Sequence, residues 1–314
     1  MKPHDEIFRE MVSDPEAQRD MIRVCLPDLA GRIDLDSVTA VDATFTGGKQ
    51  ADLLLSMRER GDGERRGRKH LVYMLVEHKS YHDPLVPTQL FRYMGAIWHQ
   101  QWELRESNLR GPLPLIHPVV LYHGERPWTT PLELTGQHEA GDSDTVPFVT
   151  DLVYRLVDLS TIEPERLRVA TRTLAYLITL RHVFRRLEQP TARQLVETLG
   201  MLSIGAKTRI RLFEYLLFSM PDENTELLVT ELEEREYTME GGEAIMTVAQ
   251  ELRRQGREEG LRYGREEGLK DGREEATHEV ARRMLAKGAT VDFVVETTGL
   301  TAEQVAALRN DEKE

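Results

Sequence analysis

The ten residues LVYMLVEHKS at positions 71–80 constrain the fold of this chain more than any other segment. Apolar side chains fill most of the segment, and successive side chains of a strand point to opposite faces of a sheet. The pattern predicts a buried strand on which Glu77 and Lys79 share one face, while His78 lies on the other. A carboxylate and an ammonium group therefore end an otherwise apolar row.

A second carboxylate is expected beside the first. The segment QADLLL, which begins at Gln50, is typical of a strand and contains Asp52. In a hairpin with the strand at 71–80, Asp52 lies beside Glu77. Two carboxylates and one backbone carbonyl, with waters, form a sufficient ligand set for Mg²⁺. We therefore expect Asp52, Glu77 and the carbonyl of His78 to bind Mg²⁺ or Mn²⁺.

Lys79 completes the arrangement expected of a metal-dependent phosphodiesterase. Its ammonium group is expected to orient the attacking water or to offset developing negative charge. The competing interpretation is a surface salt bridge between Glu77 and Lys79 at the end of an ordinary strand, since so short a motif also arises by chance.

Further motifs follow in order through the first half of the chain. They are Pro3-His4-Asp5 with Phe8, Cys25-Leu26-Pro27, Gln50 to Leu54, Glu77 to Ser80, Tyr93-Met94, Pro118 to Gly124 and Pro127-Trp128. Together they resemble the Rpn family of recombination-promoting nucleases, also described as transposases, within the PD-(D/E)XK nuclease superfamily. The resemblance implies a DNA endonuclease linked to recombination or mobile elements. Many members carry Gln where this chain has Lys79, and the lysine matches the fuller superfamily pattern.

Gln89 and Tyr93 are four residues apart and would share one face of a helix. They resemble the Gln-x-x-x-Tyr motif of RecB-like nucleases, which implies that Gln89 holds a water or phosphate and that Tyr93 contacts DNA. Alternatively, the helix packs Leu90 and Met94 inward and leaves Gln89 merely exposed. Asp5 caps the first helix or, with its neighbour Glu6, lies near the metal as an outer acid.

The order of predicted elements favours an α/β fold. Helices are expected at 5–12 and 15–26, strands near 38–46, 51–57 and 70–79, a helix near 85–106, and strands at 116–122 and 148–159. This αβββαβ order is that of a restriction-endonuclease-like core with a mixed central sheet. We expect a nuclease-like domain at 1–160, a helical region at 161–249 with helices at 164–187, 192–202 and 207–218, a glycine-repeat charged connector at 250–276 and a small helical element at 277–314.

Charge is unevenly distributed along the chain. The net charge is −13, whereas affinity for DNA usually comes from Lys and Arg that neutralise phosphates. Residues 1–110 hold 16 basic and 18 acidic residues, so most of the negative charge lies further along the chain. Six basic residues crowd the link between the two catalytic strands, where they either grip a nucleic-acid backbone or form a solvated connection. They are Arg58, Arg60, Arg65, Arg66, Arg68 and Lys69.

Composition excludes several classes of protein. One cysteine, Cys25, permits no intrachain disulfide. The sequence contains no run of about 18 apolar residues and no signal-peptide pattern at its start, so we expect a cytoplasmic protein that does not bind membranes. The spacing of histidines and cysteines also fits no zinc site.

Glycine recurs every fourth residue from Gly256 to Gly272. Because each Gly costs about 1 kcal/mol relative to Ala within a helix, we expect a flexible, partly helical connector. Glycine-mediated helix pairing in a homo-oligomer is the alternative, and similar tails occur in the family that the chain resembles.

The C-terminal end has the spacing of a helix-turn-helix. Helices are expected at 279–287, 291–297 and 301–308, with a turn at Gly299 and a capping box formed by Thr301 and Gln304. The would-be recognition helix has few basic residues, which favours a protein contact over DNA binding. The alternative to an enzyme is accordingly a non-catalytic nuclease-fold scaffold that binds DNA or proteins through this tail.

Overall fold

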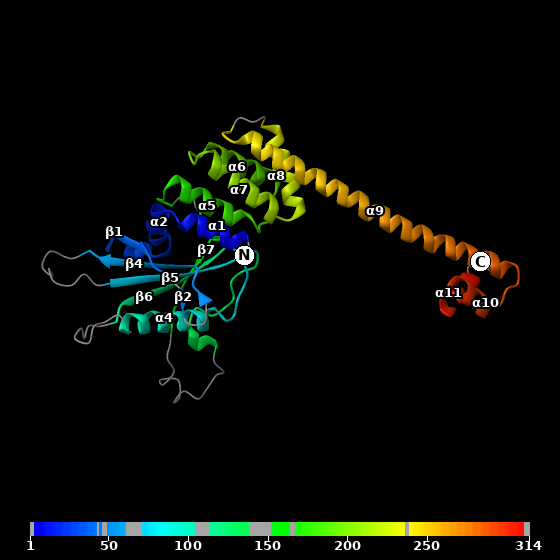
Figure 1. The fold of residues 1–314 in the computed structure, drawn as a ribbon, viewed down its shortest axis with the longest axis horizontal. Helices are drawn as coiled ribbons and strands as arrows, with labels where there is room; N and C mark the ends of the chain where they lie inside the picture. The colour runs from blue at the N-terminus through cyan, green and yellow to red at the C-terminus, as the bar shows by residue number, and fades with distance from the viewer. Residues whose placement is uncertain are drawn as a thin grey trace, which may run out of the picture. The chain divides into compact units, whose positions relative to one another are not determined.

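The computed structural model describes residues 3–42, 44–45, 49–60, 71–103, 113–137, 152–163, 167–235 and 239–310. The chain divides into two compact units, Met1–Val248 and Ala249–Glu314. The first unit contains a mixed sheet of five strands in the order β1-β4-β5-β6-β7 (Figure 1). The strands are β1 (Ile33–Ala40), β4 (Leu53–Glu59), β5 (Leu71–Lys79), β6 (Leu115–Tyr122) and β7 (Arg155–Asp158).

The predicted strand at 71–80 is confirmed as β5, the centre of the sheet. It pairs with β4 in an antiparallel manner and with β6 in a parallel manner, and every residue from Val72 to His78 is buried. A strand with neighbours on both sides and elements on both faces needs apolar residues in both rows, which explains the nearly continuous apolar sequence.

Helices cover the two faces of the sheet. Figure 1 shows α4 (Val86–Glu103) on one face and α1 (Pro3–Val12), α2 (Pro15–Cys25) and α5 (Thr171–His182) on the other. Buried side chains of α4 and of the Tyr73 row of β5 share one apolar cluster. The predicted α/β class with a mixed central sheet is therefore confirmed.

Short elements complete the sheet layer. A separate antiparallel pair, β2 (Thr44–Phe45) and β3 (Lys49–Gln50), precedes β4, while α3 (Pro27–Ala30) precedes β1 and the 3₁₀ turn η1 (Leu134–Gln137) follows β6.

Two predicted boundaries on the sheet are wrong or incomplete. The first strand begins at Ile33, not near residue 38, because its partner β4 extends to Glu59, which pairs with Ile33. Acidic residues at alternate positions hid this start from the apolar pattern. The last strand begins at Arg155, and residues 148–151 of the predicted strand lie outside the described residues.

Further helices pack beside α1, α2 and α5. They are α7 (Ala206–Ser219), which contacts α1 and α5, then α8 (Asp222–Glu234), which contacts α7, and α6 (Gln189–Met201), which contacts α8. The predicted helix at 164–187 corresponds to the shorter α5, and residues 164–166 lie outside the described part of the chain. Arg209 is buried and donates to the carbonyls of Leu199 and Leu202 at the end of α6, at 3.1 and 2.6 Å.

The second unit contains most of α9 (Gly242–Ala286), then α10 (Val291–Thr298) and α11 (Ala302–Asn310). The expectation of only partial helix at 250–276 is wrong, because α9 is continuous there. Arg254 pairs with Glu251 and Glu258 at 2.6 and 2.5 Å, and such pairs each offset part of the glycine cost.

The predicted turn and capping box at the C-terminal end are confirmed. Gly299 has a φ of +74°, the left-handed conformation that ends α10. The backbone N–H of Thr301 donates to Gln304 Oε1 at 2.9 Å, and that of Gln304 donates to Thr301 Oγ1 at 3.2 Å. Among the described residues, none of the helices is both long enough and apolar enough to cross a membrane.

Candidate functional site

The register of β4 and β5 determines where the acidic residues meet. Leu53 pairs with Val76, so one further step along the antiparallel pair sets Asp52 opposite Glu77. Asp52 Oδ2 accepts a hydrogen bond from the backbone N–H of His78 at 2.8 Å. The structure therefore brings together the two carboxylates that the sequence analysis paired.

Gln89 of α4 joins the two functional residues of β5. Its amide nitrogen donates to Glu77 Oε2 at 2.8 Å, and its carbonyl oxygen accepts from Lys79 Nζ at 3.1 Å. The same nitrogen lies 3.1 Å from the hydroxyl of Tyr93, which donates to the carbonyl of Gln50 at 3.3 Å. Gln89 thus belongs to the site even though α4 also packs its apolar residues inward.

Lys79 lies between two carboxylates. Its Nζ is 3.6 Å from Glu77 Oε2 and 3.3 Å from Asp83 Oδ2. The side chains of Glu77 and Lys79 are only 3% and 11% exposed, so the alternative of an exposed surface salt bridge is wrong. A buried pair of this kind is costly unless further groups support it, and Gln89 and Asp83 provide that support.

Burial shifts the pKa of both carboxylic acids of the site upward. Burial, and then the charge of Asp52, raises the pKa of Glu77 well above its ordinary range. Burial is also the main reason that the pKa of Asp52 is raised, although the His78 N–H opposes the shift. Burial alone would lower the pKa of Lys79, but Glu77, Asp83 and Asp52 together raise it.

One carboxylate oxygen of the site has no hydrogen-bond partner within the part of the chain that the structure describes. Glu77 Oε1 is buried and accepts no hydrogen bond from any described residue. Within the described part of the chain, no three His, Cys, Asp or Glu side chains form a metal-binding group. Two carboxylates, one of them with a free buried oxygen, nevertheless fit a hard cation that keeps several waters, as Mg²⁺ does.

His78 presents its side chain to the opposite face of the sheet. The ring stacks between those of Phe8 and His123, with centroids 4.6 Å from each. Burial lowers the pKa of His78 well below its ordinary value, so the ring is neutral. Because the N–H and C=O of a strand residue point to the same side, the carbonyl of His78 faces the side of Asp52.

The structure does not place Asp5 at the capping position before the first helix. Helix α1 begins at Pro3, so Asp5 lies inside the first turn and does not precede the helix. The negative charge of Asp5 raises the pKa of Asp52, and the positive charge of Arg9 lowers it. Both side chains therefore act on the site, and the interpretation of Asp5 as an outer acid remains consistent with the structure.

The sequence analysis missed Asp83 and Arg9. Asp83 precedes Pro84, and an Asp-Pro pair is a turn signal that could have drawn attention to it. The turn brings Asp83 back to Lys79, four residues earlier. Arg9 carries no comparable signal. Of the six basic residues predicted between the two catalytic strands, only Arg58 and Arg60 lie within the described residues. Arg58 belongs to β4 itself, where it pairs with Asp34 of β1, so its predicted place in the link is wrong.

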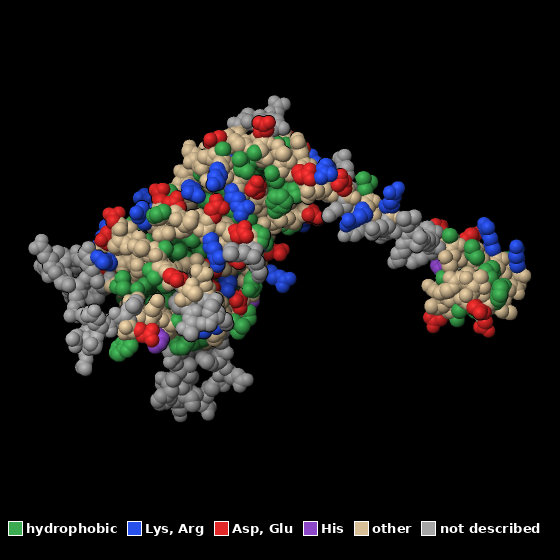
Figure 2. Space-filling view, in the orientation of Figure 1, with side chains coloured by type: hydrophobic (Ala, Val, Ile, Leu, Met, Phe, Trp, Pro, Cys, Tyr) green, Lys and Arg blue, Asp and Glu red, His purple; other side chains and the backbone are tan. Residues whose placement is uncertain are grey.

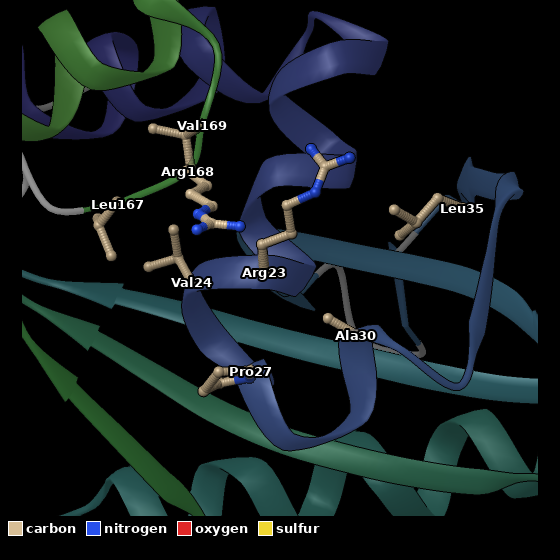
Figure 3. Close-up of a pocket in the computed structure, with 8 residues that line it drawn as sticks. All are labelled: Arg23, Val24, Pro27, Ala30, Leu35, Leu167, Arg168 and Val169. Carbon is tan, nitrogen blue, oxygen red and sulfur yellow. The ribbon is translucent and has the colours of Figure 1, made fainter.

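A separate hollow lies away from these residues. It has a volume of about 380 Å³ and is formed by α2, α3, β1 and the segment before α5 (Figure 3). It contains no residue of the predicted site. Its lining residues are Arg23, Val24, Pro27, Ala30, Leu35, Leu167, Arg168 and Val169.

Comparison with known proteins gives the family. Residues 2–209 match a family model described as "Putative transposase, YhgA-like", and this match covers more than half of the chain. The chain belongs to the YhgA-like transposase family. Residues 274–310 of this YhgA-like protein match a second model, "Rpn/YhgA-like nuclease family, C-terminal HTH domain". The second match confirms the helix-turn-helix spacing and suggests that this end binds DNA.

Three relatives of this YhgA-like protein illustrate the family. Recombination-promoting nuclease RpnD of Escherichia coli O157:H7 is 28% identical, with 80% of this chain and 94% of RpnD aligned. Recombination-promoting nuclease RpnC of E. coli K12 is 27% identical, with 82% of each chain aligned. The K12 protein named inactive recombination-promoting nuclease-like protein RpnE is 26% identical, with 95% of each aligned. No solved structure matches the chain.

Proposed function

We propose that this YhgA-like protein is a metal-dependent DNA endonuclease that hydrolyses phosphodiester bonds in recombination or mobile-element transactions. The observation that carries the proposal is the buried pair Asp52 and Glu77, in which Glu77 Oε1 has no hydrogen-bond partner among the described residues, beside the ammonium group of Lys79. The names of RpnD and RpnC support the same activity. We also propose that the sheet is the core of a restriction-endonuclease-like, PD-(D/E)XK fold and that the protein is cytoplasmic.

Asp52, Glu77 and the carbonyl of His78 would hold Mg²⁺ or Mn²⁺. When bound, the ion would supply a Lewis acid that polarises a phosphate oxygen and acidifies a water. Lys79 positions its ammonium group to orient a water or to offset negative charge on the phosphate. Gln89 keeps Glu77 and Lys79 in their relative positions, and Tyr93 anchors Gln89 through its hydroxyl.

A cleavage assay tests this proposal. The purified chain is incubated with supercoiled, linear and single-stranded DNA, with Mg²⁺, Mn²⁺ or a chelator. Asp52→Asn keeps an oxygen that can accept from the His78 N–H but removes the charge, so we expect it to lose cleavage while remaining folded. Asp36→Asn is the matched control, because Asp36 is an exposed residue of β1 in the same sheet, and this variant should cleave normally. Equal cleavage by Asp52→Asn and the wild type would expose a contaminant.

A second candidate function is a non-catalytic scaffold that binds DNA or partner proteins. The observation in its favour is RpnE, which is named inactive and aligns over nearly the whole chain. The scaffold is the better account if the folded wild type fails to cut any of the substrates with either metal.

The C-terminal helix-turn-helix is proposed to bind DNA, and the tail that leads to it to support a homo-oligomer. Removal of residues 249–314 tests both roles. If cleavage survives while self-association is lost, the tail is an assembly element. If DNA affinity falls instead, the tail brings the substrate to the catalytic unit.

A further inference from the structure

The outer face of α4 carries an exposed aromatic stripe. Phe91, Gly95, Trp98 and Trp102 are spaced by four, three and four residues, which sets them along one side of the helix. Phe91 is 41% exposed and Trp102 is 65% exposed, whereas Trp98 is partly buried against the core. A Cβ built on Gly95 would meet nothing within 4 Å. The stripe is therefore accessible at Phe91, Gly95 and Trp102, whereas Trp98 connects it to the core.

The apolar surface continues beyond the helix. Trp98 donates from its indole nitrogen to the carbonyl of Pro114 at 3.0 Å, which holds the start of β6 against α4. Leu113 and Leu115, on either side of Pro114, are 45% and 59% exposed. Figure 2 shows hydrophobic side chains at the surface in the region of α4. Contiguous exposed apolar surface of this kind marks an interaction site more often than chance exposure does.

Charges beside the stripe make it complementary to itself. Arg92, in the first half of α4, and Glu103, its last residue, are both exposed and lie on the same flank of the stripe. The guanidinium of Arg92 lies 5.2 Å from the ring centre of Tyr93, and Glu103 is 3.4 Å from His99. The contact with Tyr93 brings no acidic group to Arg92, and the contact with His99 brings no permanently charged cation to Glu103.

Two antiparallel copies of α4 would match these features. With a two-fold axis between Ala96 and Ile97, Phe91 of one copy faces Trp102 of the other, since the two residues are equally far from the axis. Gly95 likewise faces the position of Trp98, whose indole stays on the carbonyl of Pro114 in its own copy. Arg92 and Glu103 are offset by two residues about this axis, about 3 Å along the helix, a distance that their long side chains span.

We propose that α4 is a self-association surface through which two copies of this chain pair about a two-fold axis. Such an interface is isologous, so each contact occurs twice. A nucleic-acid strand fits the stripe less well, because one Arg is offset by one Glu and phosphates favour a basic surface. The inference does not depend on the proposed nuclease activity. Because Gln89 and Tyr93 belong to the same helix, pairing would also fix the distance between two copies of the site.

Thiol cross-linking of the full chain tests the pairing. The single native cysteine, Cys25, is fully buried, so Gly95→Cys introduces the only accessible thiol. A short bismaleimide should convert the Gly95→Cys protein to a covalent dimer. Met201→Cys, at an 81% exposed position on α6, is the control and should give at least several-fold less dimer. The control also measures any cross-linking that arises from association of the tail.

Second substitutions in the Gly95→Cys protein identify the contacts. Trp102→Glu should reduce the cross-linked dimer several-fold, and Phe218→Glu should not, although the two native side chains are equally exposed at 65%. Arg92→Glu should also reduce it, because like charges then face each other, and the added change Glu103→Arg should restore it. Circular dichroism of each variant verifies that the fold is kept.

Two outcomes would overturn the proposal. One is equal cross-linking of Gly95→Cys and Met201→Cys. The other is cross-linking that Trp102→Glu and Arg92→Glu leave unchanged. Loss of DNA affinity in Trp102→Ala, without any α4 cross-link, would reassign the stripe to nucleic acid.

Discussion

The side-chain amide of Gln89 donates a hydrogen bond to Oε2 of Glu77 across 2.8 Å. Through this contact, helix α4 controls the orientation of a carboxylate on strand β5. The other end of the same amide accepts from Lys79, so one neutral side chain positions both the acid and the ammonium group. Groups that hold a ligand of this kind commonly affect metal affinity as much as activity.

Removal of this clamp should weaken cleavage. Gln89→Ala frees Glu77 and Lys79 to move, and we expect a loss of about 10–100-fold in activity, the usual cost of removing a supporting group at a metal site. The loss should be greatest at low metal concentration, so initial rates are measured across a Mg²⁺ titration. Gln100→Ala, at an exposed position further along α4, should behave as the wild type. Wild-type rates for Gln89→Ala at limiting metal would show that the clamp is dispensable.

Asp83 should act as a positioning residue for Lys79. Its Oδ2 lies 3.3 Å from Lys79 Nζ, while its Oδ1 accepts from the backbone N–H of Leu85 at 3.0 Å. Asp83→Asn keeps the turn hydrogen bond but loses the charge, so we expect a lower kcat with an unchanged KM and an unchanged melting temperature. Asp83→Ala should in addition lose about 0.5–2 kcal/mol of stability, the range measured when a residue that holds a helix start is removed.

Asp83→Glu provides a rescue test for the same contact. A glutamate restores the negative charge near Lys79, so part of the lost kcat should return. If Asp83→Asn and the wild type have the same kcat, Asp83 only stabilises the turn before α4.

Without divalent metal, Glu77 should destabilise the protein at alkaline pH. Burial and the charge of Asp52 raise the folded-state pKa of Glu77 above 4.5, so the folded state binds this proton more tightly than the unfolded state. The stabilising contribution is therefore full below pH 4.5 and is lost as the pH rises through the higher folded-state pKa.

Glu77→Gln should remove this effect. In chelator at pH 8, the variant should be more stable than the wild type by about 1–3 kcal/mol, the scale of an uncompensated buried polar group. At pH 5 the difference should shrink, and Mg²⁺ at pH 8 should stabilise only the wild type. Thermal melts at both pH values measure the comparison, with Glu125→Gln, at an exposed position, as the control. Equal melting temperatures at pH 8 would contradict the raised folded-state pKa of Glu77.

The catalytic strand could be predicted because its information is local. A period of two residues fixes which side chains of β5 share a face, and a hairpin register follows once the partner strand is known. The pairing of Asp52 with Glu77 and the shared face of Gln89 and Tyr93 therefore followed from spacing alone. The family motifs then indicated which of these neighbours carry chemistry.

The contacts that spacing did not predict come from tertiary packing. Asp5 influences Asp52 because α1 lies over the sheet, and no sequence periodicity specifies that placement. Asp83 reaches Lys79 through a turn whose geometry depends on Thr130, whose hydroxyl donates to the Asp83 carbonyl at 3.2 Å. The continuous α9 likewise shows that helix propensity is a weak guide where ion pairs accompany the glycines.

The side chain of His78 should be replaceable, because only its carbonyl is proposed to contact the metal. His78→Phe keeps a flat ring between Phe8 and His123, so we expect a change in stability below about 1.5 kcal/mol and cleavage within a few-fold of the wild type. His78→Ala leaves a cavity in the same stack and should cost about 3–5 kcal/mol, as other buried ring truncations do.

The pH dependence of these variants separates packing from charge. Burial holds the folded-state pKa of His78 well below 6.5, so its contribution to stability is present above pH 6.5 and is lost as the pH falls. His78→Phe cannot be protonated, and its melting temperature should therefore fall less than that of the wild type between pH 7 and pH 5. A folded His78→Phe protein without cleavage would assign the imidazole itself a role, because the backbone carbonyl is still present in that variant.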